Sequence, residues 1–203
     1  MKKIIWLWYA VAGVMLISCC RPAVFSGEEL LLINQGTAQT PFRVLQITDP
    51  QDAVRLRTPC GNVENFAGDS TLALLIARLK TTLIAENGVG IAASQVGVLK
   101  NIFLFMRLDL PGAPVTVAIN PEIINRPDTT VCFDRDGCLS IPGISGNSVR
   151  YPWVEVEYSN EQGECFRERL EGYSRQGVFT AVIFQHEYDH TRGILFIDKL
   201  CNL

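Results

Sequence analysis

The two histidines of this 203-residue chain, His186 and His190, stand four residues apart, with Glu187 beside the first. On an α-helix, residues four apart lie one turn from each other on the same face. Two imidazoles so placed can bind one divalent metal, and a neighbouring carboxylate can move protons for a water that the metal activates. An exposed helix with two unrelated histidines is the simpler alternative, but the pattern is specific. The spacing therefore predicts hydrolytic metal chemistry.

A catalytic metal normally takes three protein ligands and keeps one position open, so a third ligand is needed. The short tail after His190 has no histidine or glutamate, and its one carboxylate, Asp198, follows Gly193, which indicates a helix end. The third ligand should therefore come from upstream. Cys138 is the best candidate because it lies among small residues, with Pro142-Gly143 marking a turn soon after. The alternative is a free cysteine buried as a small hydrophobe.

A third segment, residues 88–97, combines three glycines, two alanines and a glutamine. It follows a periodic apolar stretch, residues 72–84, which predicts a helix that begins at Asp69 or Ser70 and ends near Asn87. The segment has no glycine at the third glycine position of the Gly-x-Gly-x-x-Gly dinucleotide-binding fingerprint. It also lacks the Gly-Lys-Ser/Thr of a P-loop. Taken alone, it is best explained as a helix-ending turn. Its small side chains leave the backbone accessible, so that another group can pack against it.

The three segments, in this order, resemble the three motifs of the peptide deformylase family: Gly-x-Gly-x-Ala-Ala-x-Gln, Glu-Gly-Cys-Leu-Ser and Gln-His-Glu-x-Asp-His. Here they stand at residues 88–95, 136–140 and 185–190. The resemblance extends over about residues 42–198, including the Gly-Ile-Leu-Phe-Ile-Asp sequence at 193–198. Three separate motifs in the right order are more specific than any one of them, so we expect a member of this family.

The resemblance implies a set of metal ligands. The residues that match the ligands of the family are Cys138, His186 and His190. The family metal is ferrous iron in the cell, often replaced by zinc, nickel or cobalt. A mixed sulfur and nitrogen ligand set suits iron or zinc and argues against magnesium or calcium.

The resemblance also implies the reaction, which is hydrolysis of the N-formyl group of formyl-methionyl peptides with release of formate. Glu187 matches the general acid and base of the family. Gln95 and the backbone N–H of Leu139 match the groups that stabilise the oxyanion. Gly90 matches a backbone position along the bound substrate, and with it we expect Ile91 to bind substrate.

One residue departs from the family pattern, because Asp136 replaces the glutamate of the second motif. That glutamate is not a metal ligand, so Asp136 is expected to orient the loop that carries the cysteine. We expect it to pair with Arg150, whose position matches a basic residue of the family. Because aspartate is one methylene shorter, either the loop must shift or the pair must loosen.

Two other functions remain open at this point. A general metallopeptidase with the His-Glu-x-x-His pattern would cleave internal peptide bonds and would not need a formyl group. A non-catalytic lipoprotein descended from a deformylase would bind metal or peptide without turnover. The change at Asp136 favours the second alternative, but every residue that the chemistry needs is present.

Composition and patterning predict the fold. A chain with 48% apolar residues can bury one good core, and a net charge of −3 without a basic stripe gives no support to nucleic-acid binding. Strands are predicted at residues 101–106, 115–119 and 153–158, with a hairpin turn at Gln162-Gly163. The apolar residues 182–184 suggest that the histidine helix is deeply buried. We therefore predict an α+β fold, with mixed short β-sheets around a central buried helix that carries the two histidines.

The N-terminus resembles an export signal. Two lysines precede an apolar run at residues 4–17, which is too short for a comfortable membrane span of about 20 residues. The Leu-Ile-Ser-Cys sequence ending at Cys19 also resembles a bacterial lipobox, whose cysteine is lipidated. Residues 1–18 are therefore predicted to be a lipoprotein signal peptide, with a membrane tether at Cys19. An uncleaved N-terminal helix is the alternative.

The remaining chain is predicted to contain a spacer at residues 19–40 and a catalytic domain at residues 41–203. The spacer is expected to hold a short helix capped by Ser26 and Glu29. The predicted location is a membrane surface outside the cytoplasm, where the substrates would be exported formylated peptides. If the true start of the protein lies further downstream, the location would be cytoplasmic.

The cysteines do not decide the compartment. Of seven cysteines, one is assigned to lipid at Cys19 and one to metal at Cys138. The other five are Cys20, Cys60, Cys132, Cys165 and Cys201. An odd remainder without a visible pairing pattern argues weakly against a disulfide framework.

Overall fold

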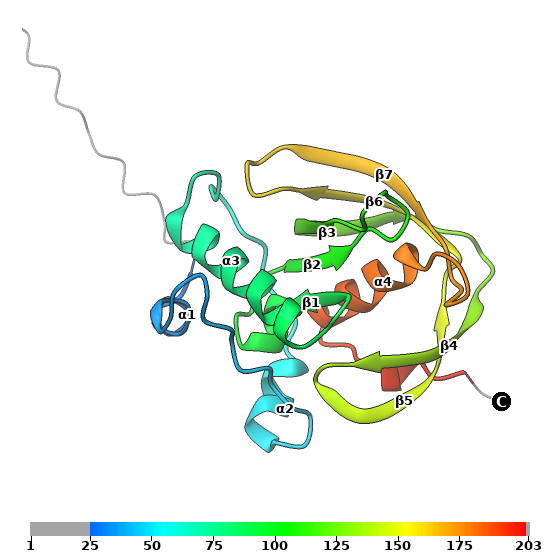
Figure 1. Ribbon diagram of the computed structural model, residues 1–203, viewed down its shortest axis with the longest axis horizontal. Helices are drawn as coiled ribbons and strands as arrows, with labels where there is room; N and C mark the ends of the chain where they lie inside the picture. Colours follow the sequence, from blue (N-terminus) through cyan, green and yellow to red (C-terminus); the bar gives the residue numbers. More distant parts are fainter. Residues whose placement is uncertain (1–24, 202–203) are drawn as a thin grey trace, which may run out of the picture.

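The computed structural model describes residues 25–201, so the predicted signal peptide and Cys19 lie outside the described residues. Its main element is an antiparallel five-stranded sheet with the strand order β1-β2-β3-β6-β7 (Figure 1). The strands are β1 (Gly90–Ala92), β2 (Ile102–Met106), β3 (Val115–Asn125), β6 (Trp153–Ser159) and β7 (Cys165–Glu171). The three predicted strands are confirmed as β2, β3 and β6. Gly163, with φ of 85°, lies in the predicted turn between β6 and β7.

Two helices cover opposite faces of this sheet. Successive side chains of a strand point to opposite faces, so Ile102 and Leu104 pack with α3 (Ser70–Ala85), on the other side of the sheet from Phe103 and Phe105. Those two phenylalanines pack with α4 (Thr180–Thr191), the helix of the two histidines. The predicted α+β fold around a buried histidine helix is confirmed (Figure 1).

Helix α3 begins as predicted, because the Asp69 side chain accepts a hydrogen bond from the Leu72 N–H at 2.8 Å. It ends at Ala85, with Glu86 as its C-cap, and Asn87 follows with φ of 52°. The segment after it is more than the predicted turn. It forms β1 and a 3₁₀ turn, η1 (Ala93–Val96), because edge pairing with β2 satisfies its backbone.

Helix α4 is buried on nearly all sides. The ring of Phe184 packs edge-to-face on Phe103 and Phe105, with ring centroids 4.9 and 5.2 Å apart. The helix ends at Thr191, and Gly193 follows with φ of 71°, which confirms the predicted helix end. Apolar packing therefore fixes the position of the helix that presents both histidines.

A separate two-stranded sheet carries Cys138. It consists of β4 (Val131–Cys138) and β5 (Ile141–Arg150), joined by a turn at residues 139–140. The turn predicted at Pro142-Gly143 is therefore wrong. These residues lie within β5, where the pairing register shifts between Gly137 and Cys138 and leaves extra residues on β5.

The C-terminal segment adds to this hairpin. After the 3₁₀ turn η2 (Phe196–Lys199), Leu200 forms an antiparallel bridge with Ser148, and the Cys201 N–H donates to the Asn147 carbonyl at 2.8 Å. A disulfide joins Cys201 to Cys132 of β4, 69 residues away in sequence. The argument against disulfides was therefore wrong, because pairing of the tail with β5 brings together two cysteines whose spacing gives no signal.

The N-terminal part of the described chain packs on the α3 side of the core. Helix α1 (Gly27–Asn34) has the predicted cap, in which Ser26 and Glu29 each bond to the other's backbone N–H. Phe25 and Ile33 are buried in the apolar cluster that includes α3. Part of the predicted spacer thus contacts the core, while the boundary at residues 40 and 41 stays a prediction.

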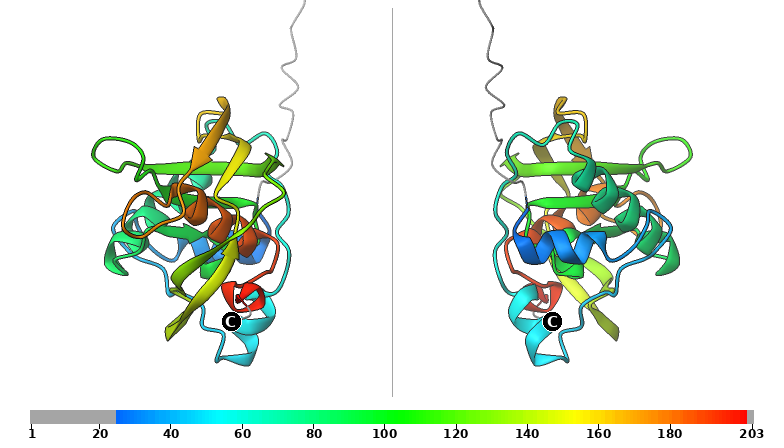
Figure 2. Two further views of the ribbon diagram at one scale, coloured as in Figure 1. Left: turned by 90° about the vertical axis from the view of Figure 1, so that its right-hand side faces the viewer. Right: turned by 90° about the vertical axis from the view of Figure 1, so that its left-hand side faces the viewer.

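Helix α2 (Pro50–Leu56) lies beside η2, as both views of Figure 2 show, and Arg57 forms an ion pair with Asp198 there. Within residues 25–201, we find no helix that is both long and apolar enough to cross a membrane.

Candidate metal centre

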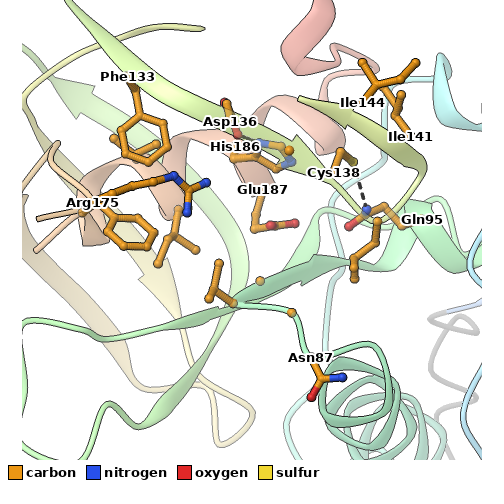
Figure 3. A pocket seen from close by; sticks show the side chains of 18 of the residues that line it. Asn87, Gln95, Phe133, Asp136, Cys138, Ile141, Ile144, Arg175, His186 and Glu187 are labelled. Atoms are coloured by element: carbon orange, nitrogen blue, oxygen red, sulfur yellow. Dashed lines mark hydrogen bonds and ion pairs between the residues drawn. The ribbon is translucent and has the colours of Figure 1, made fainter. Parts of the chain in front are cut away.

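Three side chains from two distant segments meet beside the turn of the β4–β5 hairpin. The ligand atoms of Cys138, His186 and His190 all lie within 4.8 Å of one another. The Cys138 Sγ is 3.1 Å from the His190 Nε2. Figure 3 shows Cys138 on the hairpin facing His186 and Glu187 on α4. The structure thus brings together the three residues that the sequence analysis assigned as ligands.

The orientation of His186 is fixed by a buried carboxylate. Its Nδ1 lies 3.0 Å from Asp136 Oδ1, which leaves Nε2 free to face the other ligand atoms. The predicted pair of Asp136 with Arg150 is also present, with Arg150 Nη2 donating to Asp136 Oδ2 at 2.7 Å. Asp136 therefore connects the cysteine hairpin to the histidine helix.

The polar network around Arg150 is larger than the sequence analysis predicted. Its Nη1 donates to Asp189 Oδ2 at 2.6 Å, and Lys199 Nζ donates to Asp189 Oδ1 at 2.6 Å. The Ser148 hydroxyl donates to Asp136 Oδ2 at 2.6 Å. Asp189 belongs to the third motif, so the sequence could have indicated its role in this network. Nothing in the sequence indicated a role for Ser148 or Lys199.

The electrostatic environment favours charged forms of two groups. Burial alone would raise the pKa of Asp136, but His186 and Arg150 hold it well below its usual value. Burial would likewise raise the pKa of the Cys138 thiol, but the charges and hydrogen bonds of His190 and His186 hold that pKa well below its ordinary value. A thiolate is therefore presented to the two imidazoles.

These residues fit a divalent transition metal. One thiolate sulfur and two imidazole nitrogens converge, and a soft donor set of this kind suits iron or zinc. Among the described residues, Glu187 Oε2 is buried beside this group without a hydrogen-bond partner. A buried carboxylate oxygen without a partner is expected where a further polar ligand or water belongs.

Glu187 is buried at the base of this site, and burial raises its pKa to about 7. Its carboxylate lies against Gly90 of β1. A Cβ added to Gly90 would come within 2.8 Å of the Glu187 Cδ. The absence of a side chain at Gly90 therefore leaves the space that the Glu187 carboxylate occupies.

Gln95 points its amide at the hairpin. Its Oε1 accepts from the Ala92 N–H at 2.9 Å, which fixes the amide so that Nε2 faces Ser140 Oγ at 3.3 Å and Cys138 Sγ at 3.5 Å. Leu139, in the turn after Cys138, lines the same pocket. The structure thus places both predicted oxyanion-stabilising residues beside the metal ligands.

A pocket of about 390 Å³ opens in front of the candidate metal group. Its walls are mostly apolar. The apolar lining residues that the sequence analysis did not assign to a site are Val89, Phe133, Ile141, Ile144, Phe179, Val182 and Ile183. Ile91 does not line this pocket. Alternation along β1 turns it into the apolar cluster on the α3 side, while Gly90 faces Glu187. The structure therefore gives no support to a substrate contact by the Ile91 side chain.

Comparison with known proteins adds to this geometry. Residues 42–203 match the sequence profile of the family described as polypeptide deformylase. The chain belongs to the polypeptide deformylase family. It is 41% identical to the peptide deformylase of Thermotoga sp. (strain RQ2) over 160 residues, which cover 78% of this chain and 87% of that protein. It is 36% identical to peptide deformylase 2 of Nostoc sp. (strain PCC 7120) over 163 residues, 77% of this chain and 84% of that protein.

Solved peptide deformylases share the fold. The crystal structure from Thermotoga maritima superposes with a TM-score of 0.69 at 34% identity, covering 80% of this chain and 99% of that one. A class I type b peptide deformylase from Acinetobacter baumannii, bound to Met-Ala-Ser, superposes with a TM-score of 0.66 at 31% identity, with coverage of 80% and 99%. Membership of this deformylase family makes the protein a metal-dependent hydrolase.

Proposed function

We propose that this deformylase removes the N-formyl group from formyl-methionyl peptides at the centre formed by Cys138, His186 and His190. The observation that carries the proposal is the convergence of these three ligand atoms within 4.8 Å of one another, with Glu187 adjacent to His186. The products are formate and a peptide with a free N-terminus.

We propose ferrous iron as the resident metal, with zinc, nickel or cobalt as substitutes. The support is the thiolate and imidazole donor set, which suits these metals. When bound, such a metal supplies a Lewis acid that lowers the pKa of water toward about 7 and polarises the formyl carbonyl.

Glu187 moves the protons of the reaction. Its pKa of about 7 lets the carboxylate accept a proton from the attacking water near neutral pH and then donate it to the departing amine. The water oxygen first forms a bond to the formyl carbon, whose carbonyl oxygen becomes an oxyanion, and the bond between that carbon and the peptide nitrogen then breaks as the oxyanion returns to a carbonyl. Gly90 supports this role by leaving the carboxylate room beside β1.

Gln95 and the Leu139 N–H stabilise the oxyanion that forms from the formyl oxygen. The Ala92 N–H holds the Gln95 amide so that its Nε2 donors face the hairpin, ready before substrate arrives. Removal of one such donor typically slows a reaction by about 100-fold or more. Gln95→Ala should therefore lower kcat with little effect on bound metal.

The test is formate release by protein purified without oxygen, measured together with metal content. We expect stoichiometric metal and release of formate from formyl-Met-Ala-Ser, and Glu187→Gln should keep the metal but lose most turnover. Cleavage of internal bonds in unformylated peptides would instead identify a general metallopeptidase. Metal-replete protein that binds the formyl peptide without releasing formate would identify a non-catalytic binding protein.

We further propose that the protein is a lipoprotein tethered through Cys19 at a membrane surface outside the cytoplasm, where it acts on exported formylated peptides. The sequence of residues 1–19 supports this, and so does the Cys132–Cys201 disulfide, because disulfides persist mainly in oxidising compartments. Mass spectrometry of the mature protein should find a lipidated Cys19 at the N-terminus. An intact Met1 would refute the tether.

A further inference from the structure

One basic side chain lies in the otherwise apolar wall of the active-site pocket. Arg175 stands on the segment between β7 and α4, and it is the only arginine or lysine among the described residues that line this pocket. Figure 3 shows its guanidinium beside Phe133, directed across the pocket toward Glu187. A cation at this place needs an explanation that the hydrolysis of a neutral formamide does not supply.

The Arg175 guanidinium is held in place. Its Nε donates to the Asp134 carbonyl at 3.0 Å, and its Nη2 donates to the Arg135 carbonyl at 2.6 Å. Its Cζ also lies 5.0 Å from the ring centroid of Phe133 and 5.4 Å from that of Phe179. An exposed arginine usually samples many rotamers, so these four contacts lower the entropic cost of binding a ligand there.

The charge of Arg175 is not neutralised by its neighbours. Arg107 and Arg150 each pair with two carboxylates, whereas both partners of Arg175 are neutral carbonyls. Within residues 25–201, no carboxylate lies within ion-pair distance of Arg175, and its Nη1 makes no hydrogen bond. An oriented guanidinium with a free N–H edge is suited to bind a carboxylate.

We propose that Arg175 determines substrate specificity by binding a carboxylate on the peptide beyond the formylated residue. This inference rests on the proposed deformylation. The carboxylate is either an acidic side chain of a following residue or the terminal carboxylate of a short formyl-peptide. Both sources present the same planar group to the guanidinium.

Two matched pairs of peptides separate the sources. The first pair is formyl-Met-Ala-Ser and its C-terminal amide, and the second pair is the amides of formyl-Met-Asp-Ser and formyl-Met-Asn-Ser. Formate release is measured for the wild type and for Arg175→Gln and Arg175→Lys. Arg167→Ala, which removes an exposed arginine of β7, serves as the control.

In the wild type, we expect KM to be about tenfold lower for the carboxylate member of at least one pair. This is the gain in affinity that one charge-assisted hydrogen bond typically gives. Arg175→Gln should abolish this difference through KM rather than kcat, and Arg175→Lys should restore part of it. Arg167→Ala should keep the full preference. Equal KM values within both pairs in the wild type, or a preference that survives in Arg175→Gln, would overturn the proposal.

A binding measurement separates this inference from the proposed function. Calorimetric titration with Met-Ala-Ser and with its amide reports carboxylate recognition without turnover. Carboxylate-dependent binding that Arg175→Gln removes, without formate release from any peptide, would support the Arg175 site and refute deformylation. Formate release without a carboxylate preference in either assay would refute the Arg175 site alone.

Discussion

The two halves of the metal centre are held in place by different forces. His186 and His190 stand on α4, which packs through Ala181, Ile183 and Phe184 into an apolar cluster shared with the five-stranded sheet. Cys138 stands on a two-stranded sheet whose buried apolar cluster is small, consisting of Ile141, Leu195 and Phe196. The hairpin is held in addition by the ion pairs of Asp136 with Arg150 and His186 and by the Cys132–Cys201 disulfide.

This contrast means that the two halves should respond to different perturbations. Hydrophobic burial is not directional and tolerates many substitutions, whereas a buried ion pair depends on each of its members. Regions with few buried apolar contacts also open locally at lower free energy than the core. We therefore expect α4, which carries the histidines, to lose its position only when the whole protein unfolds. The β4–β5 hairpin, which carries Cys138, can open locally while the rest of the protein stays folded.

The largest effect should follow from Phe184→Ala. The side chain is fully buried between Phe103 and Phe105, so its loss should lower the free energy of unfolding by about 3–5 kcal/mol. Chemical denaturation followed by circular dichroism measures this. As a control, Leu31→Ala removes a side chain that is 71% exposed and should change stability by about 0.5 kcal/mol or less. Equal losses in the two variants would mean that α4 is not held by its apolar face.

Removal of the disulfide should have the next largest effect, mostly in the hairpin. The double variant Cys132→Ser, Cys201→Ser should lower stability by about 2–4 kcal/mol, because the link closes a long loop. Hydrogen exchange should speed up in β4, β5 and the C-terminal segment, and metal should dissociate faster. Cys165→Ser, at an exposed free cysteine, should change neither. Equal acceleration of exchange in β2 and α4 would show that the two halves open together.

The same contrast explains what the sequence could reveal. The histidine pair was predictable because both residues lie on one helix, where spacing of four fixes their face. The helix capped by Asp69 and the strand at residues 102–106 follow from local periodicity in the same way. Local patterns therefore describe the apolar half of the molecule well.

The hairpin half could not be read in this way. Whether Cys138 is a ligand or a buried hydrophobe depends on its distance from α4, which no local pattern encodes. Cys132 and Cys201 meet only because the tail pairs with β5, and Pro142-Gly143 lies in a bulge where a turn was predicted. Cys138 was already a candidate from its surroundings, and the resemblance to a family favoured it as a ligand. The resemblance could not predict contacts such as that of Ser148 with Asp136, which depend on this chain's own side chains.

A third prediction tests the contribution of the large sheet to catalysis. In Gly90→Ala, the new methyl group would displace the Glu187 side chain rather than any backbone, so the loss of stability should be smaller than that of Phe184→Ala. The loss of the carboxylate position should lower kcat/KM by about 100-fold, which corresponds to about 2.7 kcal/mol. Metal content should stay at one per chain. Gly61→Ala, where a Cβ meets nothing within 4 Å, is the matched control and should keep full activity.

The smallest effect should come from Ser148→Ala, which tests how the shorter Asp136 keeps its pair with Arg150. The Ser148 hydroxyl donates to Asp136 Oδ2 at 2.6 Å and accepts from Arg150 Nε at 3.1 Å, so it bridges the two charged groups. Because Asp136 keeps its direct bonds to Arg150 and His186, loss of the bridge should cost about 1 kcal/mol of unfolding free energy. Ser145→Ala, on the exposed side of the same strand, is the control.

The restoring change is Asp136→Glu, which adds the methylene that the family motif contains. If Ser148 compensates for the shorter side chain, Asp136→Glu should be better tolerated in the Ser148→Ala background than in the wild type, since the longer carboxylate can use the freed space. A double-mutant cycle on stability and on metal affinity measures this coupling. Additive effects of the two substitutions would show that Ser148 and Asp136 act independently, and that the hairpin tolerates the shorter acid without help from the hydroxyl.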